Sequence, residues 1–253
     1  MPDITLTTDW TDKGYSVGML KGNLLKRFPH MRIYDISHSV EPFSIKQAAY
    51  ILESCYRSFP SGTVHLVCVM PHYSHENEIV FFEKNGYFFV GPNNGLFSLI
   101  FNSPQRAGII PLDYAKKNAL NRTLCNAVTR LLRPDPNELE VEMEINQKLL
   151  IQPVVNNQNI KAIITFVDNF GNLVLNVDRK LFEKEIGKKR FSIYFKNHEA
   201  IRRLYRHYME VAVGELLCRF NSAGFLEIAC NNQSASKILE LNSGDAVQIE
   251  WKI

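Results

Sequence analysis

The first 150 residues alternate between short β-branched, apolar segments and longer segments whose apolar side chains recur at helical spacing. Strands are expected at residues 4–8, 32–36 and 64–69, and helices at residues 15–28, 45–59 and 118–132. Lys84-Asn85-Gly86 predicts a hairpin between two further strands, 79–82 and 87–90. This alternation favours an α/β domain with a mostly parallel sheet covered by helices.

The pattern changes near residue 150. Short strand-like segments then recur between clusters of Gly, Asn, Asp and Ser, at residues 160–167, 173–177, 190–195, 216–220, 225–229 and 246–251. This pattern is typical of a small all-β barrel or sandwich. We therefore expect an α/β domain over residues 1–150 and a smaller, barrel-like β domain over residues 160–253, joined by a linker at 151–159.

Composition narrows the function classes. Basic residues exceed acidic ones by only three (29 against 26) and form no long block, which argues against a nucleic-acid partner. No apolar run approaches the length of a membrane span, and the N-terminus lacks a signal-peptide pattern, so we expect a cytoplasmic protein without a membrane partner. The five cysteines lack Cys-x-x-Cys spacing, which favours buried thiols over disulfides or a zinc site.

Two strand-like runs end in a carboxylate close to an aromatic ring. Asp9 precedes Trp10 after the first run, and Asp168 lies two residues before Phe170 after a run in the second domain. This pair of residue types suits a ribose or an amine next to a purine. An isolated carboxylate at a strand end is more often a turn or helix cap, so each motif alone is weak.

The order of the motifs along the chain is more specific than any one of them. They are Thr8-Asp9, Asp35-Ile36-Ser37-His38, Gly91-Pro92-Asn93-Asn94-Gly95, Asp168-Asn169-Phe170-Gly171-Asn172, Asn221-Ser222 and Leu226-Glu227-Ile228-Ala229 followed by Asn231. In this order the chain resembles the S-adenosyl-L-methionine (SAM) hydroxide adenosyltransferases, or SAM hydrolases, over about residues 4 to 251. That family also contains the fluorinases and chlorinases.

The resemblance implies a homotrimer that binds SAM between the N-terminal domain of one subunit and the C-terminal domain of the next. The implied reaction is nucleophilic displacement at ribose C5′, from which methionine departs as a neutral thioether. Such a leaving group needs no general acid, so the site must mainly orient and desolvate the nucleophile. The resemblance implies no cofactor, with SAM itself as substrate or ligand.

The resemblance also assigns ligand contacts to the N-terminal domain. Asp9 would hold the ribose hydroxyls, Phe43 would lie against the ribose and methionine, Ser16 would contact the amino acid end, and Asn121 stands where halogenases carry a serine. A plain core residue is the competing interpretation for Phe43.

Further contacts fall in the C-terminal domain. Asp168 would hold the methionine ammonium, Phe170, Asn172 and Tyr208 would contact adenine, Ser222 would contact the carboxylate, and Asn231 would lie near the adenine edge. The competing interpretation for Asn172 is an Asx turn after Gly171, while Ser222 and Asn231 could equally be turn residues.

The chain departs from the hydrolases at the groups thought to activate water. Their aspartate, arginine and histidine fall on Met70, Asn77 and Leu120. A thioether and an alkyl chain cannot accept a proton, so hydrolysis should be lost or weakened. His72 and His75 are possible substitute bases, although an exposed loop histidine is usually only solvated.

A metal site at His72-x-x-His75-Glu76 lacks the second pair of ligands that zinc sites usually have, so no metal is expected. Two hypotheses remain open. The first is a SAM-binding enzyme of this family with weakened or altered hydrolytic activity. The alternative is a catalytically inactive protein that binds or senses SAM or adenosine.

Overall fold

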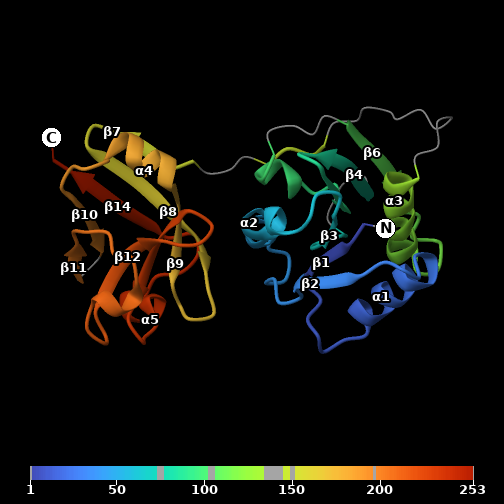
Figure 1. The fold of residues 1–253 in the computed structure, drawn as a ribbon, viewed down its shortest axis with the longest axis horizontal. Helices are drawn as coiled ribbons and strands as arrows, with labels where there is room; N and C mark the ends of the chain where they lie inside the picture. Colours follow the sequence, from blue (N-terminus) through green and yellow to red (C-terminus); the bar gives the residue numbers. More distant parts are fainter. Residues whose placement is uncertain are drawn as a thin grey trace. The chain divides into compact units, whose positions relative to one another are not determined.

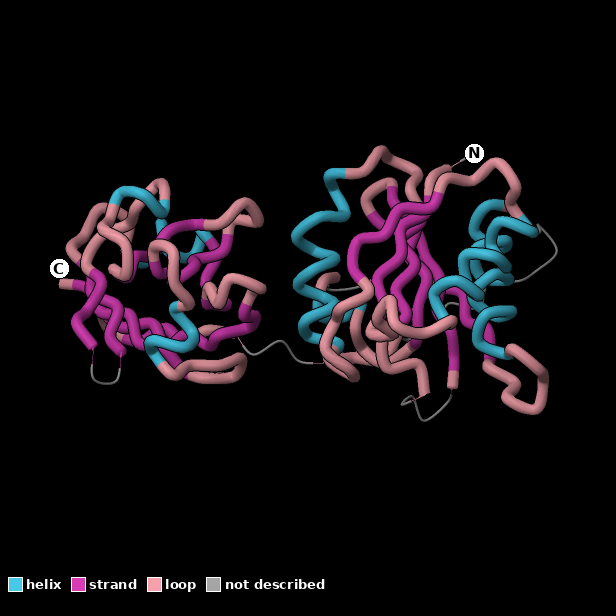
Figure 2. Tube along the Cα trace, turned by 90° about the horizontal axis from the view of Figure 1, so that it is seen from below, coloured by secondary structure: helices cyan, strands magenta, loops and turns pink. Residues whose placement is uncertain are grey.

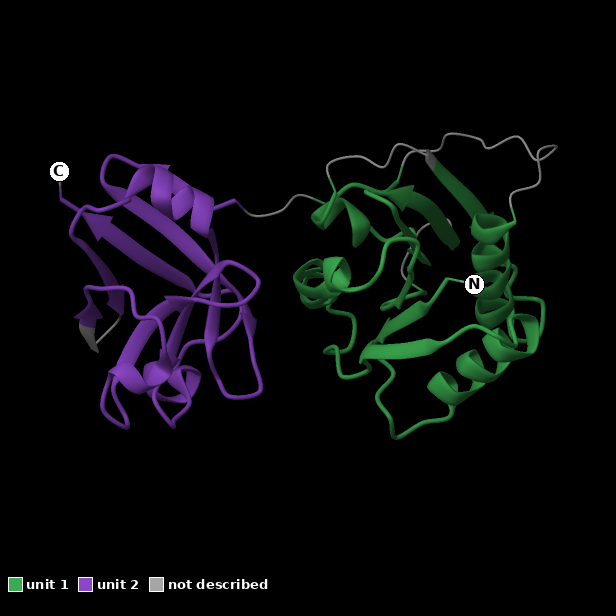
Figure 3. Cartoon of the chain, viewed as in Figure 1, with its two compact units in different colours: residues 1–149 green, residues 150–253 purple. Residues whose placement is uncertain are grey.

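A computed structural model describes residues 2–72, 77–101, 106–133, 145–148, 152–195 and 198–252. The chain divides into two compact units, residues 1–149 and 150–253 (Figure 3), and each is described separately.

The first unit is built on a six-stranded mixed sheet in the order β2-β1-β3-β5-β4-β6 (Figure 1). Its strands are β1 (Ile4–Thr8), β2 (Ile33–Ser37), β3 (Val64–Cys68), β4 (Glu78–Lys84), β5 (Tyr87–Pro92) and β6 (Arg106–Pro111). The pairs β1–β2, β1–β3 and β3–β5 are parallel, whereas β4 runs antiparallel to both β5 and β6. The expectation of a mostly parallel sheet therefore holds for one half of the sheet, because the β4–β5 hairpin reverses the chain direction.

Helices cover both faces of this sheet, as Figure 2 shows. They are α1 (Ser16–Arg27), α2 (Ile45–Cys55) and α3 (Ala119–Leu132), with short 3₁₀ helices η1 (Tyr56–Ser58) and η2 (Phe97–Leu99). Leu66 packs with α1 and α3 on one face, and Val67 packs with α2 on the other. Successive residues of β3 thus face two different cores, which explains why every residue of that strand is buried.

The hairpin predicted at Lys84-Asn85-Gly86 is confirmed. Asn85 and Gly86 join β4 to β5 with φ values of 54° and 78°, the positive pair that a two-residue hairpin turn requires. The helix expected over 45–59 ends earlier, at Cys55, and continues as η1.

Residues 145–148 also belong to the first unit. Ile145 is buried in the core that contains α2. Asn146 donates its backbone N–H to Oδ1 of Asn93 at 2.8 Å, and Lys148 donates its N–H to Oγ of Ser98 at 2.8 Å. This segment therefore packs against the loop that follows β5.

The second unit is an antiparallel, nearly closed barrel-like sheet in the order β11-β10-β14-β8-β9-β13-β12, with β7 paired to β8. Its strands are β7 (Val154–Asn156), β8 (Asn159–Val167), β9 (Leu173–Asp178), β10 (Phe191–Phe195), β11 (His198–Ile201), β12 (Leu216–Phe220), β13 (Phe225–Cys230) and β14 (Ala246–Trp251). Its helices are α4 (Arg179–Glu185), α5 (Ala235–Leu239) and the 3₁₀ helix η3 (Tyr208–Glu210). Residues 154–156, inside the stretch expected to be a linker, pair with β8 as β7.

Among the described residues, none of the helices combines the length and the apolar character needed to cross a lipid bilayer. The five cysteines carry free thiols, and four of them are buried.

Candidate functional site

Asp9 follows β1 directly, at the carboxyl edge of the parallel part of the sheet. Its Oδ2 accepts hydrogen bonds from the backbone N–H groups of Phe43, at 3.1 Å, and Met70, at 3.2 Å. Because β2 and β3 flank β1 on opposite sides, Asp9 lies at the switch point of strand order, where open α/β sheets bind ligands. A carboxylate offers about four acceptor positions, so Asp9 retains capacity for a ligand.

Both donors to Asp9 adopt the left-handed backbone conformation, with φ of 69° at Phe43 and 49° at Met70. This conformation costs roughly 1–2 kcal/mol for an ordinary side chain, so the surroundings must hold it. Asn94 does so on the carbonyl side, because its Nδ2 donates to the carbonyl oxygens of Val69 at 2.8 Å and Met70 at 3.3 Å. Phe43 is 72% exposed, which is not the environment of a core residue.

A cavity of about 370 Å³ lies beside the segment that carries Asp9. It is lined by Trp10, Ser16, Met19, His72, Tyr114, Lys116, Asn118, Ala119, Leu120 and Asn121. The fold thus brings together four positions singled out from the sequence, namely Ser16, His72, Leu120 and Asn121, from the N-terminus of α1, the loop after β3 and the start of α3.

Other predicted positions lie outside this lining. Met70 and Asn77 are half-buried and do not line the cavity. The carbonyl of Asn77 accepts the N–H of Leu112 at 2.6 Å, so its backbone continues the pairing of β4 with β6. Arg122 lines a separate groove between α1 and α3. The three positions of the water-activating set therefore share no single cavity.

His72 has a partner that the sequence did not reveal. Its Nδ1 lies 3.0 Å from the hydroxyl of Tyr114, and the two ring centroids are 5.5 Å apart. Burial, with a smaller effect of Cys68, raises the pKa of Tyr114. The tyrosine therefore stays protonated at neutral pH and can orient the imidazole. His75 and Glu76 lie outside the described residues.

In the second unit, the loop between β8 and β9 is organised around Asp168. Its Oδ1 accepts the N–H groups of Phe170 at 2.9 Å and Asn172 at 2.8 Å, while Oδ2 accepts Nδ2 of Asn172 at 2.8 Å. Gly171 supplies the positive φ of 81° that this turn needs. Asn172 is thus a buried turn residue that binds Asp168, whereas Phe170 presents 79% of its surface to solvent.

Tyr208 contacts the buried carboxylate of Glu227, a residue for which the sequence analysis predicted no role. Its hydroxyl donates to Oε1 of Glu227 at 2.8 Å, and the Arg219 guanidinium lies 4.7 Å from the ring centroid. Burial and the bond to Glu227 raise the pKa of Tyr208 to about 12. Burial raises the pKa of Glu227, against the effects of Tyr208 and Arg219, and the Asp168 charge raises it further. Glu227 pairs with Val174, two residues after Asn172, so both groups lie near the Asp168 loop.

The last two predicted positions, Asn231 and Ser222, lie at different ends of the second unit's strands. Asn231 follows β13, and its Nδ2 donates to the carbonyl of Val211 at 2.8 Å, close along the chain to Tyr208. Ser222 is exposed in the turn between β12 and β13. The pairing of Ile228 with Leu173 and of Phe225 with Asp178 puts that turn at the opposite end of the strands from the Asp168 loop. Within one unit, Ser222 is therefore not brought together with Asp168.

Comparison with known proteins decides the family. A model of the SAM hydroxide adenosyltransferase N-terminal domain matches residues 4–126, and a model of the corresponding C-terminal domain matches residues 162–248. The chain belongs to the SAM hydroxide adenosyltransferase family. The resemblance inferred from the order of the motifs is thereby confirmed.

Relatives of this adenosyltransferase family match along most of their length. An (R)-S-adenosyl-L-methionine hydrolase of Methanocaldococcus jannaschii is 30% identical over 97% of this chain and 95% of its own length. A fluorinase of Actinoplanes sp. is 22% identical over 72% of this chain and 74% of its own. The crystal structure of an uncharacterized conserved protein from Thermotoga maritima superimposes with a TM-score of 0.83 at 29% identity, covering 97% of this chain and 99% of that one.

Proposed function

We propose that this family member binds SAM and displaces methionine from ribose C5′, with hydrolytic activity weaker than, or altered from, that of the hydrolases. The observation that carries the proposal is the Asp9 carboxylate, held by the N–H groups of Phe43 and Met70 at the switch point of the sheet. A carboxylate fixed by two backbone donors is preorganised to accept the two ribose hydroxyls.

The remaining contacts follow from the residues beside it. Ser16 and Asn121 line the adjacent cavity and would contact the amino acid end of SAM. In the second unit, Asp168 would pair with the methionine ammonium, while the exposed ring of Phe170 and the ring of Tyr208 would stack on adenine. Asn172, fixed against Asp168, and Asn231 would contact the adenine edge, and Ser222 would meet a carboxylate.

The leaving group of this reaction needs no proton. The sulfonium sulfur takes the electron pair of the breaking C5′–S bond and departs as neutral methionine thioether, while water or another nucleophile forms the new bond to C5′. Met70 and Leu120 cannot take a proton from water. His72, oriented by Tyr114 in the cavity that Leu120 also lines, is the group that would replace the lost base.

We also propose an oligomeric state and a cellular location for this protein. The chain would act as a cytoplasmic homotrimer without a cofactor, and the resemblance assigns the two halves of each ligand site to neighbouring subunits. Nucleic acid and membrane are not among the proposed partners.

A second candidate is a catalytically inactive protein that binds or senses SAM or adenosine. It is favoured by the apolar side chain of Leu120, which lines the cavity where the hydrolases have a histidine. Incubation with SAM labelled in the ribose separates the two. Labelled adenosine and an equal amount of methionine support the enzyme, whereas stoichiometric binding without turnover supports the sensor.

A further inference from the structure

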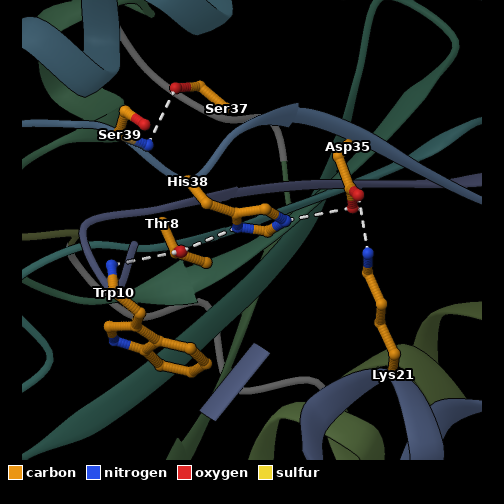
Figure 4. Close-up of polar contacts among 7 residues, drawn as sticks. All are labelled: Thr8, Trp10, Lys21, Asp35, Ser37, His38 and Ser39. Carbon is orange, nitrogen blue, oxygen red and sulfur yellow. Dashed lines mark hydrogen bonds and ion pairs between the residues drawn. The ribbon is translucent and has the colours of Figure 1, made fainter. Parts of the chain in front are cut away.

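The Asp35-Ile36-Ser37-His38 motif has no role in the proposed function, yet its histidine lies within reach of the Asp9 segment. His38 is 6% exposed. Its Nδ1 lies 2.9 Å from Oγ1 of Thr8, the residue before Asp9, and its Nε2 lies 3.1 Å from Oδ1 of Asp35 (Figure 4). The second contact is at ion-pair distance, although its alignment is poorer than that of a hydrogen bond.

The contacts continue on both sides of His38, as Figure 4 shows. Asp35 accepts a hydrogen bond from Nζ of Lys21, on α1, at 2.6 Å. Thr8 Oγ1 accepts the backbone N–H of Trp10 at 3.3 Å. The carbonyl of His38 accepts the N–H of Thr11 at 2.8 Å. Thr8 and Thr11, which lie on either side of Asp9, are therefore both held by His38.

The neighbours of His38 determine where its proton lies. A lone pair on Nε2 would be repelled by the Asp35 carboxylate, so we assign the proton to Nε2. Nδ1 is then an acceptor, and the Thr8 hydroxyl donates to it. The hydroxyl keeps its lone pairs for the N–H of Trp10. Burial opposes ionisation of Asp35, but the hydrogen bond from Lys21 and the close contact with His38 lower its pKa, so it is charged at neutral pH.

We propose that His38 is a positioning residue that sets the Thr8–Trp10 segment for ligand binding. Through Thr8 it fixes the direction of the Asp9 carboxylate and the place of Trp10, which lines the cavity. Lys21 connects this arrangement to α1, the helix whose Ser16 and Met19 line the same cavity. The inference rests on the proposed function, in which Asp9 holds the ribose.

The same strand supplies a matched control. Thr5, also on β1, has its Oγ1 2.8 Å from Nδ1 of the buried His65. Both pairs are buried threonine–histidine contacts, but Thr5 lies four residues before Asp9 and away from the cavity lining. Loss of either hydroxyl removes a comparable interaction from the fold. Only loss of the Thr8 hydroxyl should affect the ligand site.

The test uses the full chain with Trp251→Phe, which leaves Trp10 as the single tryptophan. Thr8→Val, Thr8→Ser, Thr5→Val, His38→Phe and Thr8→Val/His38→Phe are compared in this background. Trp10 emission is recorded without ligand, SAM affinity by calorimetry, and unfolding by urea titration.

We expect Thr8→Val to shift Trp10 emission and to weaken SAM binding about tenfold, the scale of one lost hydrogen bond. Thr8→Ser should restore both properties. Thr5→Val should lower the unfolding midpoint but leave emission and affinity unchanged. The loss in the double variant should be smaller than the sum of the two single losses, because each single change already removes the Thr8–His38 contact.

The inference is overturned if Thr8→Val leaves emission and affinity as in the parent, or if Thr5→Val changes them equally. Additive losses in the double variant would also overturn it. If the parent itself fails to bind SAM, the proposed function is wrong, while the emission of ligand-free Trp10 still decides whether His38 sets this segment.

Discussion

Met70 donates its backbone N–H to the carboxylate of Asp9 at 3.2 Å, although the two residues are 61 positions apart. The contact joins the ends of two adjacent parallel strands, β1 and β3. It also joins the proposed ribose-binding group to the position where the family's hydrolases carry an aspartate. The proposed ligand binding and the proposed change in chemistry are therefore testable at neighbouring residues.

Asp9→Asn should weaken SAM binding while preserving the fold. The amide oxygen of asparagine can still accept the N–H groups of Phe43 and Met70, but the negative charge is lost. Hydrogen bonds to a charged group contribute about 1.5–3 kcal/mol, so calorimetry should show a loss on that scale. Asp9→Ala should lower both affinity and stability, because the N–H groups of Phe43 and Met70 lose their acceptor. An unchanged affinity in a folded Asp9→Asn protein would remove Asp9 from the site.

Restoring the missing groups together should restore hydrolysis. Met70→Asp/Asn77→Arg/Leu120→His is expected to raise adenosine release well above that of the parent, and single changes should do little, because groups that act as a unit are non-additive. Met70→Asp should be tolerated structurally, since aspartate accepts the left-handed conformation of residue 70 better than methionine does. A triple variant that folds, binds SAM and releases no adenosine would locate the loss elsewhere.

Any residual hydrolysis should depend on His72. His72→Ala is expected to reduce adenosine release by about a hundredfold or more, the usual contribution of a general base. Tyr114→Phe should have a smaller effect, because it removes only the hydroxyl that orients the ring. Equal rates for parent and His72→Ala, measured by chromatography of the products, would exclude this base.

Subunit complementation tests the proposed trimer. Chains with Asp9→Asn and chains with Asp168→Asn should each lack intact sites. Random mixing of equal amounts after unfolding should regenerate about one quarter of the sites, since each site would take one group from each of two neighbouring chains. Binding of SAM by a monomer at full affinity, shown by sedimentation and calorimetry, would contradict the arrangement.

His65 should make the first unit sensitive to acid. Burial lowers the pKa of His65 from 6.5 to about 4, so below pH 6.5 the unfolded chain takes up a proton that the folded chain refuses. The free energy of unfolding should therefore fall between pH 6.5 and about 4, by up to roughly 3 kcal/mol. His65→Gln should flatten this dependence in urea titrations, and an unchanged slope would show that His65 is not responsible.

Long periodic segments and turn chemistry made much of the fold predictable. The strand at residues 4–8 and the Asn85-Gly86 hairpin follow from local sequence. β6 was missed, because Gly108 in a strand usually signals a break. Here the ring of Phe81, paired opposite Gly108, occupies the space that a Cβ would need. The short helices α4 and α5 contain too few turns to show a period.

Site residues were predictable where the order of motifs carried them and not where contact depends on tertiary structure. Asp9 and Asp168 were singled out from the chain alone. Tyr114 was missed because it reaches His72 from a loop after the unrecognised strand β6. Glu227 was quoted but given no role, since an acidic residue within a strand reads as solvated until its 4% exposure and its bond to Tyr208 are known.

Residues 145–148 pack against the loop after β5, and this packing limits how far the first unit can be shortened from its C-terminal end. Asn146 binds Asn93, and the next residue, Asn94, donates to the carbonyl of Met70. The backbone N–H of Met70 in turn donates to Asp9. A fragment ending at residue 133 would contain all the strands and helices that the structure describes in the first unit, yet it would lack residues 145–148, which pack against the loop after β5. The smallest fragment expected to keep the surroundings of Asp9 intact therefore extends through residue 148, beyond α3.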